Sequence, residues 1–238
     1  MSLFQKSVLN KYLKTLNQEE INLAWDKYTS HFHNLEIQEN IRNSKEEQYQ
    51  EGFFRDLFVK VFGYKINPEI DFNLTTELKN INNAKKTDGA ILQNDKVIAV
   101  IELKGTNTIE LAKVEPQVFG YKNNQPDCSY VIISNFEKLR FYIDNAVDFE
   151  EFNLFQLSKA EFNLLWLCLS ASSLLKNIPK QIKEESLTHE ERIGKKLYKD
   201  YSLFRNEIFN NIEENNPQYN KILLFKKTQK LLTNGASS

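Results

Sequence analysis

The chain has 238 residues, which is enough for one α/β core with a helical appendage or for two small domains. Its 31 Lys and Arg against 32 Asp and Glu leave a net charge of −1. This balance argues neither for nor against a nucleic-acid partner, because acidic metal ligands and basic DNA contacts in one protein can cancel. Two cysteines without CxxC spacing argue against a disulfide framework or a structural zinc site. The sequence has no signal-peptide pattern and no apolar run of bilayer length, which predicts a soluble, cytoplasmic protein with no membrane partner.

Residues 3–62 are predicted to be helical. Asn17 and Glu20 form a cap and first turn ahead of apolar residues at helical spacing. The run over residues 49–62 is apolar on more than one side, so we expect this helix to pack against more than one neighbour. Its main stripe consists of Tyr49, Phe53, Leu57 and Val61. Gly63 is expected to end this helix.

The hydrophobic period then changes to that of strands. Residues 66–74 alternate in part and predict a first strand, followed by a polar stretch over residues 79–86. Residues 87–92 and 97–104 predict two strands joined by a polar turn of three or four residues, and therefore a hairpin. The second of these is apolar on both faces, which indicates a position inside the sheet with cover above and below.

The downstream pattern completes an α/β arrangement. A helix is predicted over residues 110–122, and strands over residues 130–134 and 139–143. The order helix–strand–strand–strand–helix–strand–strand predicts a mixed central sheet flanked by helices.

The remaining chain is predicted to be a helical extension. A capping box at Ser158 and Glu161 opens an apolar helix that runs to residue 175, and a polar linker with Pro179 follows. A second capping box, at residues 188–191, opens a helix that residues 215–217 break. Its apolar stripe consists of Ile193, Leu197, Tyr201, Phe204, Ile208 and Ile212. A final helix is expected over residues 219–232, and its apolar pattern stops so abruptly that we expect a truncated module or an exposed docking surface.

Three charged residues on the predicted hairpin carry the chemistry. Glu102 and Lys104 share one face of their strand, because side chains alternate with a period of two, and the hairpin brings Asp88 beside Glu102. Two neighbouring carboxylates repel unless a cation lies between them, and Mg²⁺ takes carboxylate and carbonyl oxygens together with waters. An ammonium beside the cation can orient the attacking water or help to deprotonate it, so this set suits attack on a phosphodiester.

This constellation resembles the D…ExK motif of the PD-(D/E)XK nuclease superfamily, which has the restriction-endonuclease-like fold. Asp88 is followed, after thirteen residues, by Glu102-Leu103-Lys104. The resemblance implies that Asp88, Glu102 and the Leu103 carbonyl hold Mg²⁺, with Mn²⁺ as a substitute, and that Lys104 positions the attacking water. Glu51 stands where many members carry an additional acid, for a second ion or a water. Gln117 and Tyr121 resemble the QxxxY motif of the RecB-like branch, which implies that they support the site or contact the DNA backbone.

A longer resemblance covers nearly the whole chain. Six segments are similar to the N-terminal part of type IIG restriction-modification enzymes: Glu51-Gly-Phe-Phe-Arg-Asp-Leu-Phe, Lys86-Thr-Asp-Gly-Ala-Ile, Ile101-Glu-Leu-Lys-Gly, Gln117 with Tyr121, Ser134-Asn-Phe-Glu and Leu197-Tyr-Lys-Asp-Tyr. This implies a nuclease domain over residues 1–157 and the start of a connector over residues 158–238. The methyltransferase motifs that should follow are missing. We therefore expect an excised domain, a truncated product or one part of a split system, with methyltransferase and target-recognition regions in a longer protein or a partner subunit.

The implied function is Mg²⁺-dependent endonuclease cleavage of double-stranded DNA in a restriction-modification system, with transient homodimers as a family-level expectation. A solvated surface hairpin, an inactive nuclease-like domain that binds DNA, and a structural module that docks a methyltransferase chain are the alternatives. Glu51 could be a solvated first-turn residue favoured by the helix dipole, and Gln117 and Tyr121 could be a polar surface residue and a core aromatic. Histidines 31 and 33 point to different sides of a helix, which argues against a metal site there. The basic residues that could meet phosphates, or form a charged outer helix face, are Lys195, Lys196, Lys199 and Arg205.

Overall fold

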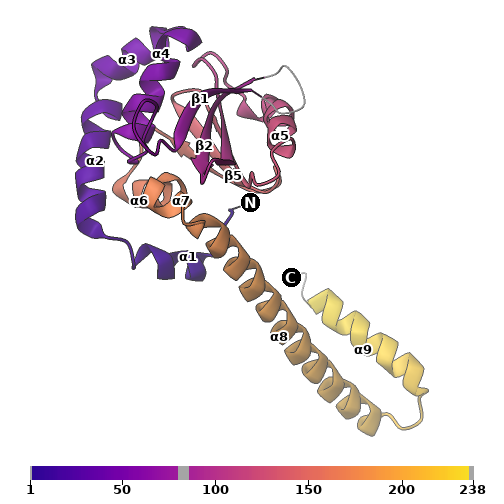
Figure 1. The fold of residues 1–238 in the computed structure, drawn as a ribbon. Helices are drawn as coiled ribbons and strands as arrows, with labels where there is room; N and C mark the ends of the chain where they lie inside the picture. Colours follow the sequence, from indigo (N-terminus) through magenta and orange to yellow (C-terminus); the bar gives the residue numbers. More distant parts are fainter. Residues whose placement is uncertain (1, 80–85, 236–238) are drawn as a thin grey trace. The chain divides into compact units, whose positions relative to one another are not determined.

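The computed structural model describes residues 2–79 and 86–235. The contacts within the chain divide it into two compact units, residues 1–186 and 187–238. The first unit is mixed α/β and carries every strand that the structure describes (Figure 1). The prediction of an α/β protein with a mixed central sheet is confirmed at this level.

The sheet has six strands in the order β1-β2-β3-β4-β5-β6. Their bounds are β1 Leu74–Lys79, β2 Lys86–Gln93, β3 Lys96–Leu103, β4 Tyr130–Ser134, β5 Lys138–Ile143 and β6 Phe149–Asn153. Neighbouring strands run antiparallel except β3 and β4, which are parallel. A parallel pair requires a crossover, and helix α5 (Glu115–Asn123) provides it.

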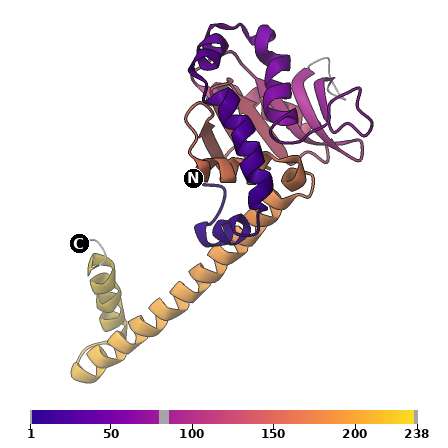
Figure 2. The same cartoon turned by 90° about the vertical axis from the view of Figure 1, so that its left-hand side faces the viewer.

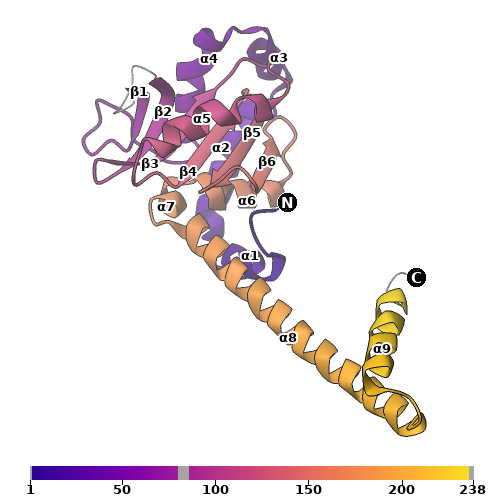
Figure 3. The ribbon, with the colours of Figure 1, turned by 90° about the vertical axis from the view of Figure 1, so that its right-hand side faces the viewer.

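Helices cover both faces of the sheet, as the sequence of β3 predicts. Helix α5 lies on one face over a small apolar cluster that includes Val100, Val118 and Val131 (Figure 3). The other face carries the larger core, with α2 lying across it (Figure 2). The helices of the first unit besides α5 are α1 Lys6–Leu13, α2 Gln18–Phe32, α3 Leu35–Asn43, α4 Glu46–Phe53, the π-helix η1 Phe54–Val59, the 3-10 helix η2 Leu111–Lys113, α6 Lys159–Leu169 and α7 Ala171–Leu174.

The N-terminal helical region follows the predicted pattern. The Asn17 side chain accepts hydrogen bonds from the backbone N–H groups of Glu19 and Glu20, so it caps α2. Phe53, Phe54 and Phe58 are fully buried in α4 and η1, and Tyr49 is partly buried. Gly63 follows with a φ of 78°, a left-handed conformation that glycine adopts without steric cost, and the helical region ends there.

The predicted hairpin is formed by β2 and β3. Its turn is tighter than expected, because Gln93 pairs directly with Lys96 and leaves only Asn94 and Asp95 between the strands. Both turn residues have positive φ, which Asn and Asp tolerate better than other residues with a side chain. A two-residue turn of this kind matches the right-handed twist of the strands.

The expected strand over residues 66–74 is wrong for most of its length. Ile66 makes only an isolated bridge to Leu74, and β1 begins at Leu74. The intervening residues form turns, with Asp71 at positive φ and the Ile70 side chain 84% exposed. Partial alternation of apolar residues misled the prediction because Asn, Pro and Asp interrupt it, and such residues favour turns. Most of the predicted polar stretch after β1, residues 80–85, lies outside the described residues.

Strand β6 was not predicted. It pairs with β5 at the edge of the sheet, where Arg140 lies opposite Glu151 and binds it with an Nε–Oε2 distance of 2.6 Å. Two consecutive glutamates between Phe149 and Phe152 obscure the alternation that marks a half-buried strand. Charged side chains are common on edge strands, since they discourage pairing with another chain.

Helix α6 begins at the predicted capping box. The Ser158 side chain accepts a hydrogen bond from the Glu161 backbone, and the Glu161 carboxylate accepts one from the Ser158 backbone. The helix ends earlier than expected, because Ser170 is extended and separates α6 from α7. Since α6 is buried in the first unit, the compact units divide after Ser186, later than the predicted boundary at residue 157.

Replacing Ser158 with Ala is expected to lower the free energy of unfolding by about 1 kcal/mol, because the first turn of α6 loses its side-chain acceptor. Urea denaturation measures the change. Ser30→Ala is the matched control, since that serine lies within α2 and bonds only a carbonyl of its own helix. Equal stabilities of the two variants would contradict a capping role for Ser158.

Beyond residue 186 the structure describes two helices. Helix α8 runs without interruption over Ile178–Asn215, so the predicted linker and the second capping box at residues 188–191 are wrong. A proline is tolerated near a helix start, which is where Pro179 lies. Helix α9 spans Lys221–Gly235, and Phe225 stacks edge-on against Phe209. Several residues of the predicted stripe are largely exposed, among them Ile193, Leu197 and Phe204.

Candidate active site

The hairpin and two helices bring charged and polar side chains together at one end of β3. Gly89 pairs with Ile101, so continuing the antiparallel register by one residue puts Asp88 opposite Glu102 on the same face. The Asp88 Oδ2 atom accepts a hydrogen bond of 2.7 Å from the Leu103 N–H. This bond fixes the Asp88 carboxylate against the end of β3.

Lys104 lies on the same side as Glu102. Its ammonium donates to Glu102 Oε1 at 2.8 Å and to the Leu103 carbonyl oxygen at 3.0 Å. The Glu102 side chain is only 3% exposed, so this is an ion pair with one partner almost completely removed from water. A buried carboxylate at this position is tolerable only because charged and polar partners surround it.

Helix α5 supplies further partners to the same carboxylate. The Gln117 amide donates to Glu102 Oε1 and to the Tyr121 hydroxyl, both at 2.9 Å. Gln117 and Tyr121 are one turn apart, so both reach the site from the same side of the helix. The structure thus brings Asp88, Glu102, Lys104, Gln117 and Tyr121 into one connected group.

Glu51 lies elsewhere, and Glu46 takes the place expected of it. Glu51 is largely exposed and binds Arg55 at 2.8 Å, one turn further along the helical segment. Glu46, in the first turn of α4, accepts a hydrogen bond of 3.1 Å from the Gly105 N–H, and its other oxygen lies 3.7 Å from the Lys104 ammonium. Sequence reasoning missed Glu46 because it treated residues 3–62 as helical without locating the start of α4.

Burial dominates the electrostatics of the two carboxyl groups. It raises the pKa of Glu102 to about 7, because the hydrogen bond from Lys104, which lowers this pKa, does not outweigh burial together with the smaller increase from the Asp88 charge. Burial also raises the pKa of Asp88, against the opposing effect of the Leu103 N–H. Burial alone would lower the pKa of Lys104, but the hydrogen bond to Glu102 and the surrounding carboxylates outweigh it, so that pKa is raised. Lys104 is therefore an ammonium at neutral pH.

The donor atoms suit a hard divalent cation. Glu102 Oε2 is buried and has no hydrogen-bond partner among the residues that the structure describes, which is costly for a carboxylate oxygen unless a cation or water meets it. The Asp88 carboxylate and the Leu103 carbonyl add two more oxygens of the kind that Mg²⁺ prefers. Within residues 2–79 and 86–235 no three His, Cys, Asp or Glu side chains form a metal-binding group by themselves. A cation held here would therefore use two carboxylates, one carbonyl and water.

Comparisons with known proteins add no homologue to this picture. No protein-family model, curated protein or solved structure matches the chain. In the described part of the chain, no helix combines the length and the apolar character needed to cross a membrane. Since no known protein matches, the geometry of the site itself indicates what chemistry it can perform.

Glu46→Gln is expected to weaken Mg²⁺ binding and any Mg²⁺-dependent activity by about 10–100-fold, as is typical when a residue that orients metal ligands is lost. The neutral amide fits in the same space, but it lacks the negative charge of Glu46 that attracts the Lys104 ammonium away from Glu102. Mg²⁺ titration with a thermal-shift readout measures the affinity. The matched control is Glu36→Gln, which alters an exposed first-turn glutamate of α3. An unchanged affinity in Glu46→Gln would show that Glu46 does not support the site.

Proposed function

We propose that this protein is a Mg²⁺-dependent endonuclease that hydrolyses DNA phosphodiester bonds, and that its first unit has a restriction-endonuclease-like fold. The observation that supports this most directly is that Asp88 and Lys104 meet Glu102 at the end of β3, where the buried Glu102 Oε2 atom has no hydrogen-bond partner among the described residues. In this proposal the chain is the cleavage module of a type IIG restriction-modification system, acting on double-stranded DNA with a methyltransferase partner.

Each residue has a distinct task in this proposal. Asp88, Glu102 and the Leu103 carbonyl would hold Mg²⁺, or Mn²⁺ as a substitute, and the cation when bound would stabilise the negative charge that develops on the phosphate. Gln117 donates to Glu102 Oε1 and helps to fix the orientation of this carboxylate. The Tyr121 hydroxyl accepts from the same amide and fixes its orientation.

Lys104 acts as a positively charged donor. With a raised pKa it stays protonated at neutral pH, so it orients the attacking water and stabilises negative charge instead of removing a proton. Its ammonium already lies within 3.0 Å of Leu103 O and 2.8 Å of Glu102 Oε1. A cation held by the Leu103 carbonyl would compete with the Lys104 ammonium for that oxygen, and Glu46 offers the ammonium a second carboxylate 3.7 Å away.

The ion pair between Lys104 and Glu102 favours a second candidate function. Lys104 gives the Glu102 carboxylate a cationic partner from the chain itself. A nuclease-like domain that binds DNA or assembles with a methyltransferase subunit, without cleaving, would retain this arrangement. It would bind DNA in a salt-dependent manner and show no metal-dependent nicking.

Nicking of supercoiled plasmid separates the two candidates. The wild-type chain is incubated with plasmid in EDTA, in Mg²⁺ and in Mn²⁺, and the relaxed and linear forms are quantified. Endonuclease function predicts relaxed product with either cation and none in EDTA. Salt-sensitive binding without nicking in either cation would favour the inactive domain instead.

A further inference from the structure

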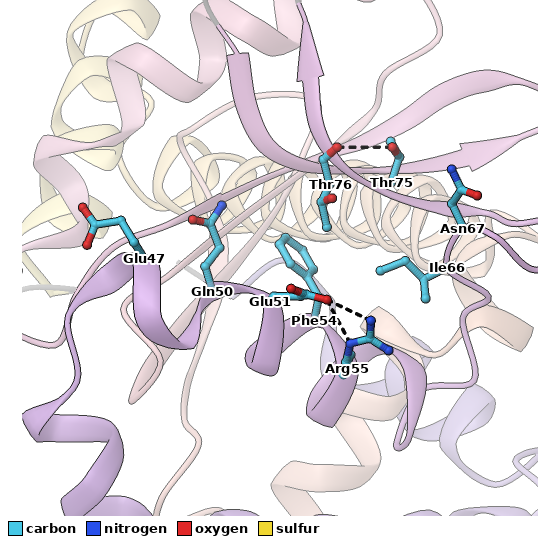
Figure 4. Close-up of a pocket in the computed structure, with 9 residues that line it drawn as sticks. All are labelled: Glu47, Gln50, Glu51, Phe54, Arg55, Ile66, Asn67, Thr75 and Thr76. Carbon is cyan, nitrogen blue, oxygen red and sulfur yellow. Dashed lines mark hydrogen bonds and ion pairs between the residues drawn. The ribbon is translucent and has the colours of Figure 1, made fainter.

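A polar pocket lies beside the candidate site, between the α4–η1 helical segment and the edge strand β1 (Figure 4). Its volume is about 410 Å³. Gln50 and Glu51 line it from the helical side, Thr76 points toward them from β1 next to Thr75, and Asn67 lies at one end. The hydrolysis proposed above uses none of the side chains on the β1 side.

The pocket and the site share a wall. Gln50 lines the pocket, and its side chain is also close enough to the Asp88 carboxyl to lower the pKa of that group slightly. Phe54 lines the pocket too and packs directly against Gly89, where an added Cβ would meet the Phe54 ring at 2.5 Å. A strand whose phosphate lies at Asp88 would therefore have its neighbouring nucleotide at this pocket.

The charges of the pocket disfavour a phosphate group. Glu47, Glu51 and Arg55 together carry a net charge of −1, which repels an anion. The Glu51–Arg55 pair is largely exposed, and exposed pairs one turn apart contribute little to stability, so either partner can turn to a ligand. The pocket instead suits a neutral group that donates hydrogen bonds.

Bases with an exocyclic amino group fit this chemistry. Carboxylates accept hydrogen bonds from the cytosine N4 amino group, and side-chain amides such as those of Gln50 and Asn67 pair with adenine through its N6 and N7 atoms. The Thr76 hydroxyl accepts or donates as needed. A volume of about 410 Å³ lies near the lower end of the range for small-molecule pockets, which suits one nucleoside.

We propose that this pocket takes an unstacked adenine or cytosine base from the nucleotide next to the bond that the site cleaves. The proposal rests on the endonuclease function proposed above and adds a base preference to it. Extruding a base from a duplex costs a few kcal/mol and costs least where the strand is single or mismatched. The pocket therefore favours cleavage beside an unpaired or weakly paired adenine or cytosine.

Nucleoside titrations test the pocket without requiring cleavage. Cytidine is compared with uridine and adenosine with inosine, since each pair exchanges an amino group for an oxo group, and binding to the full chain is followed by NMR. We expect the amino-bearing member to bind about tenfold more tightly in the wild type. Glu51→Ala and Thr76→Val should remove this preference, while Glu36→Ala on α3 and Lys104→Ala should retain it. Equal binding within both pairs, or a preference that survives both pocket substitutions, would overturn the proposal.

Mapping of nick positions separates this inference from the proposed function. The ends produced from nicked plasmid are sequenced, and adenine or cytosine should be enriched at one fixed position beside the nick. Glu51→Ala should abolish that enrichment. Nicks without any base enrichment would refute the pocket and leave the endonuclease function standing. Absence of nicking would refute the endonuclease function, and with it the position of the pocket beside a cleaved bond. The nucleoside titrations alone would then decide whether the pocket binds an amino-bearing base.

Discussion

Lys104→Ala is expected to reduce Mg²⁺-dependent plasmid nicking by about 10²–10⁴-fold, the usual range for losing a positioned proton donor or acceptor. The substitution removes the ammonium that contacts Glu102 Oε1 and Leu103 O. It also leaves the nearly buried Glu102 carboxylate without its cationic partner. Asp88→Ala should reduce nicking comparably, because it removes one of the two carboxylates offered to the cation. Nicking rates in Mg²⁺ and Mn²⁺ measure both effects.

The loss must come from chemistry and not from unfolding. Far-UV circular dichroism of both variants should match the wild type closely, since Asp88 lies near the start of β2, Lys104 directly follows β3, and neither belongs to the main apolar core. Lys113→Ala is the matched control, because it removes a lysine whose ion pair with Glu110 is exposed. Full nicking by Lys104→Ala and Asp88→Ala would refute the proposed catalytic roles.

The central part of the fold was predictable because its signals are local. Strand β3 is apolar on both faces, and a strand of that kind has to lie inside a sheet covered on both sides. The caps at Asn17 and Ser158 are fixed by side chains a few residues from the groups they bind. These features depend on sequence spacing alone, so they could be located without tertiary information.

The errors occur where distant contacts decide the outcome. Helix α8 continues through residues 188–191, although Thr, His and Glu there have the spacing of a capping box. A capping box favours a helix start only if the residues before it are not already helical. The local sequence does not specify whether the preceding residues are helical. Strand β6 likewise exists through its pairing with β5, and its two glutamates hide the pattern.

The site was partly predictable for the same reason. The alternation of β3 determines that Glu102 and Lys104 share a face, and the hairpin determines that Asp88 approaches Glu102. Glu46 reaches Gly105 across 59 positions of sequence, and nothing in its local pattern distinguishes it from Glu51. Long-range placement of α4 selects between the two acids, so only the structure could show which one contacts the site.

Replacing Glu102 with Gln is expected to change how stability depends on pH. An ordinary glutamate has a pKa of 4.5, whereas burial raises the pKa of Glu102 in the folded protein to about 7. Between these values the folded state holds a proton that the unfolded state has released. The free energy of unfolding contributed by this group is therefore fully present below pH 4.5 and is lost as pH rises through 7, by about 3 kcal/mol in all.

Urea denaturation in EDTA at pH 5 and pH 8 measures this effect. The wild type should lose stability between the two values, and Glu102→Gln should lose less, because the amide is neutral throughout and can still accept hydrogen bonds from Lys104 and Gln117. Asp88, whose pKa is also raised by burial, contributes in the same direction and remains in both proteins. Mg²⁺ at pH 8 should restore stability to the wild type more than to the variant, since a cation stabilises the ionised carboxylate. An identical pH dependence in the two proteins would mean that Glu102 ionises without cost, and the physical reason for placing a cation beside it would then be lost.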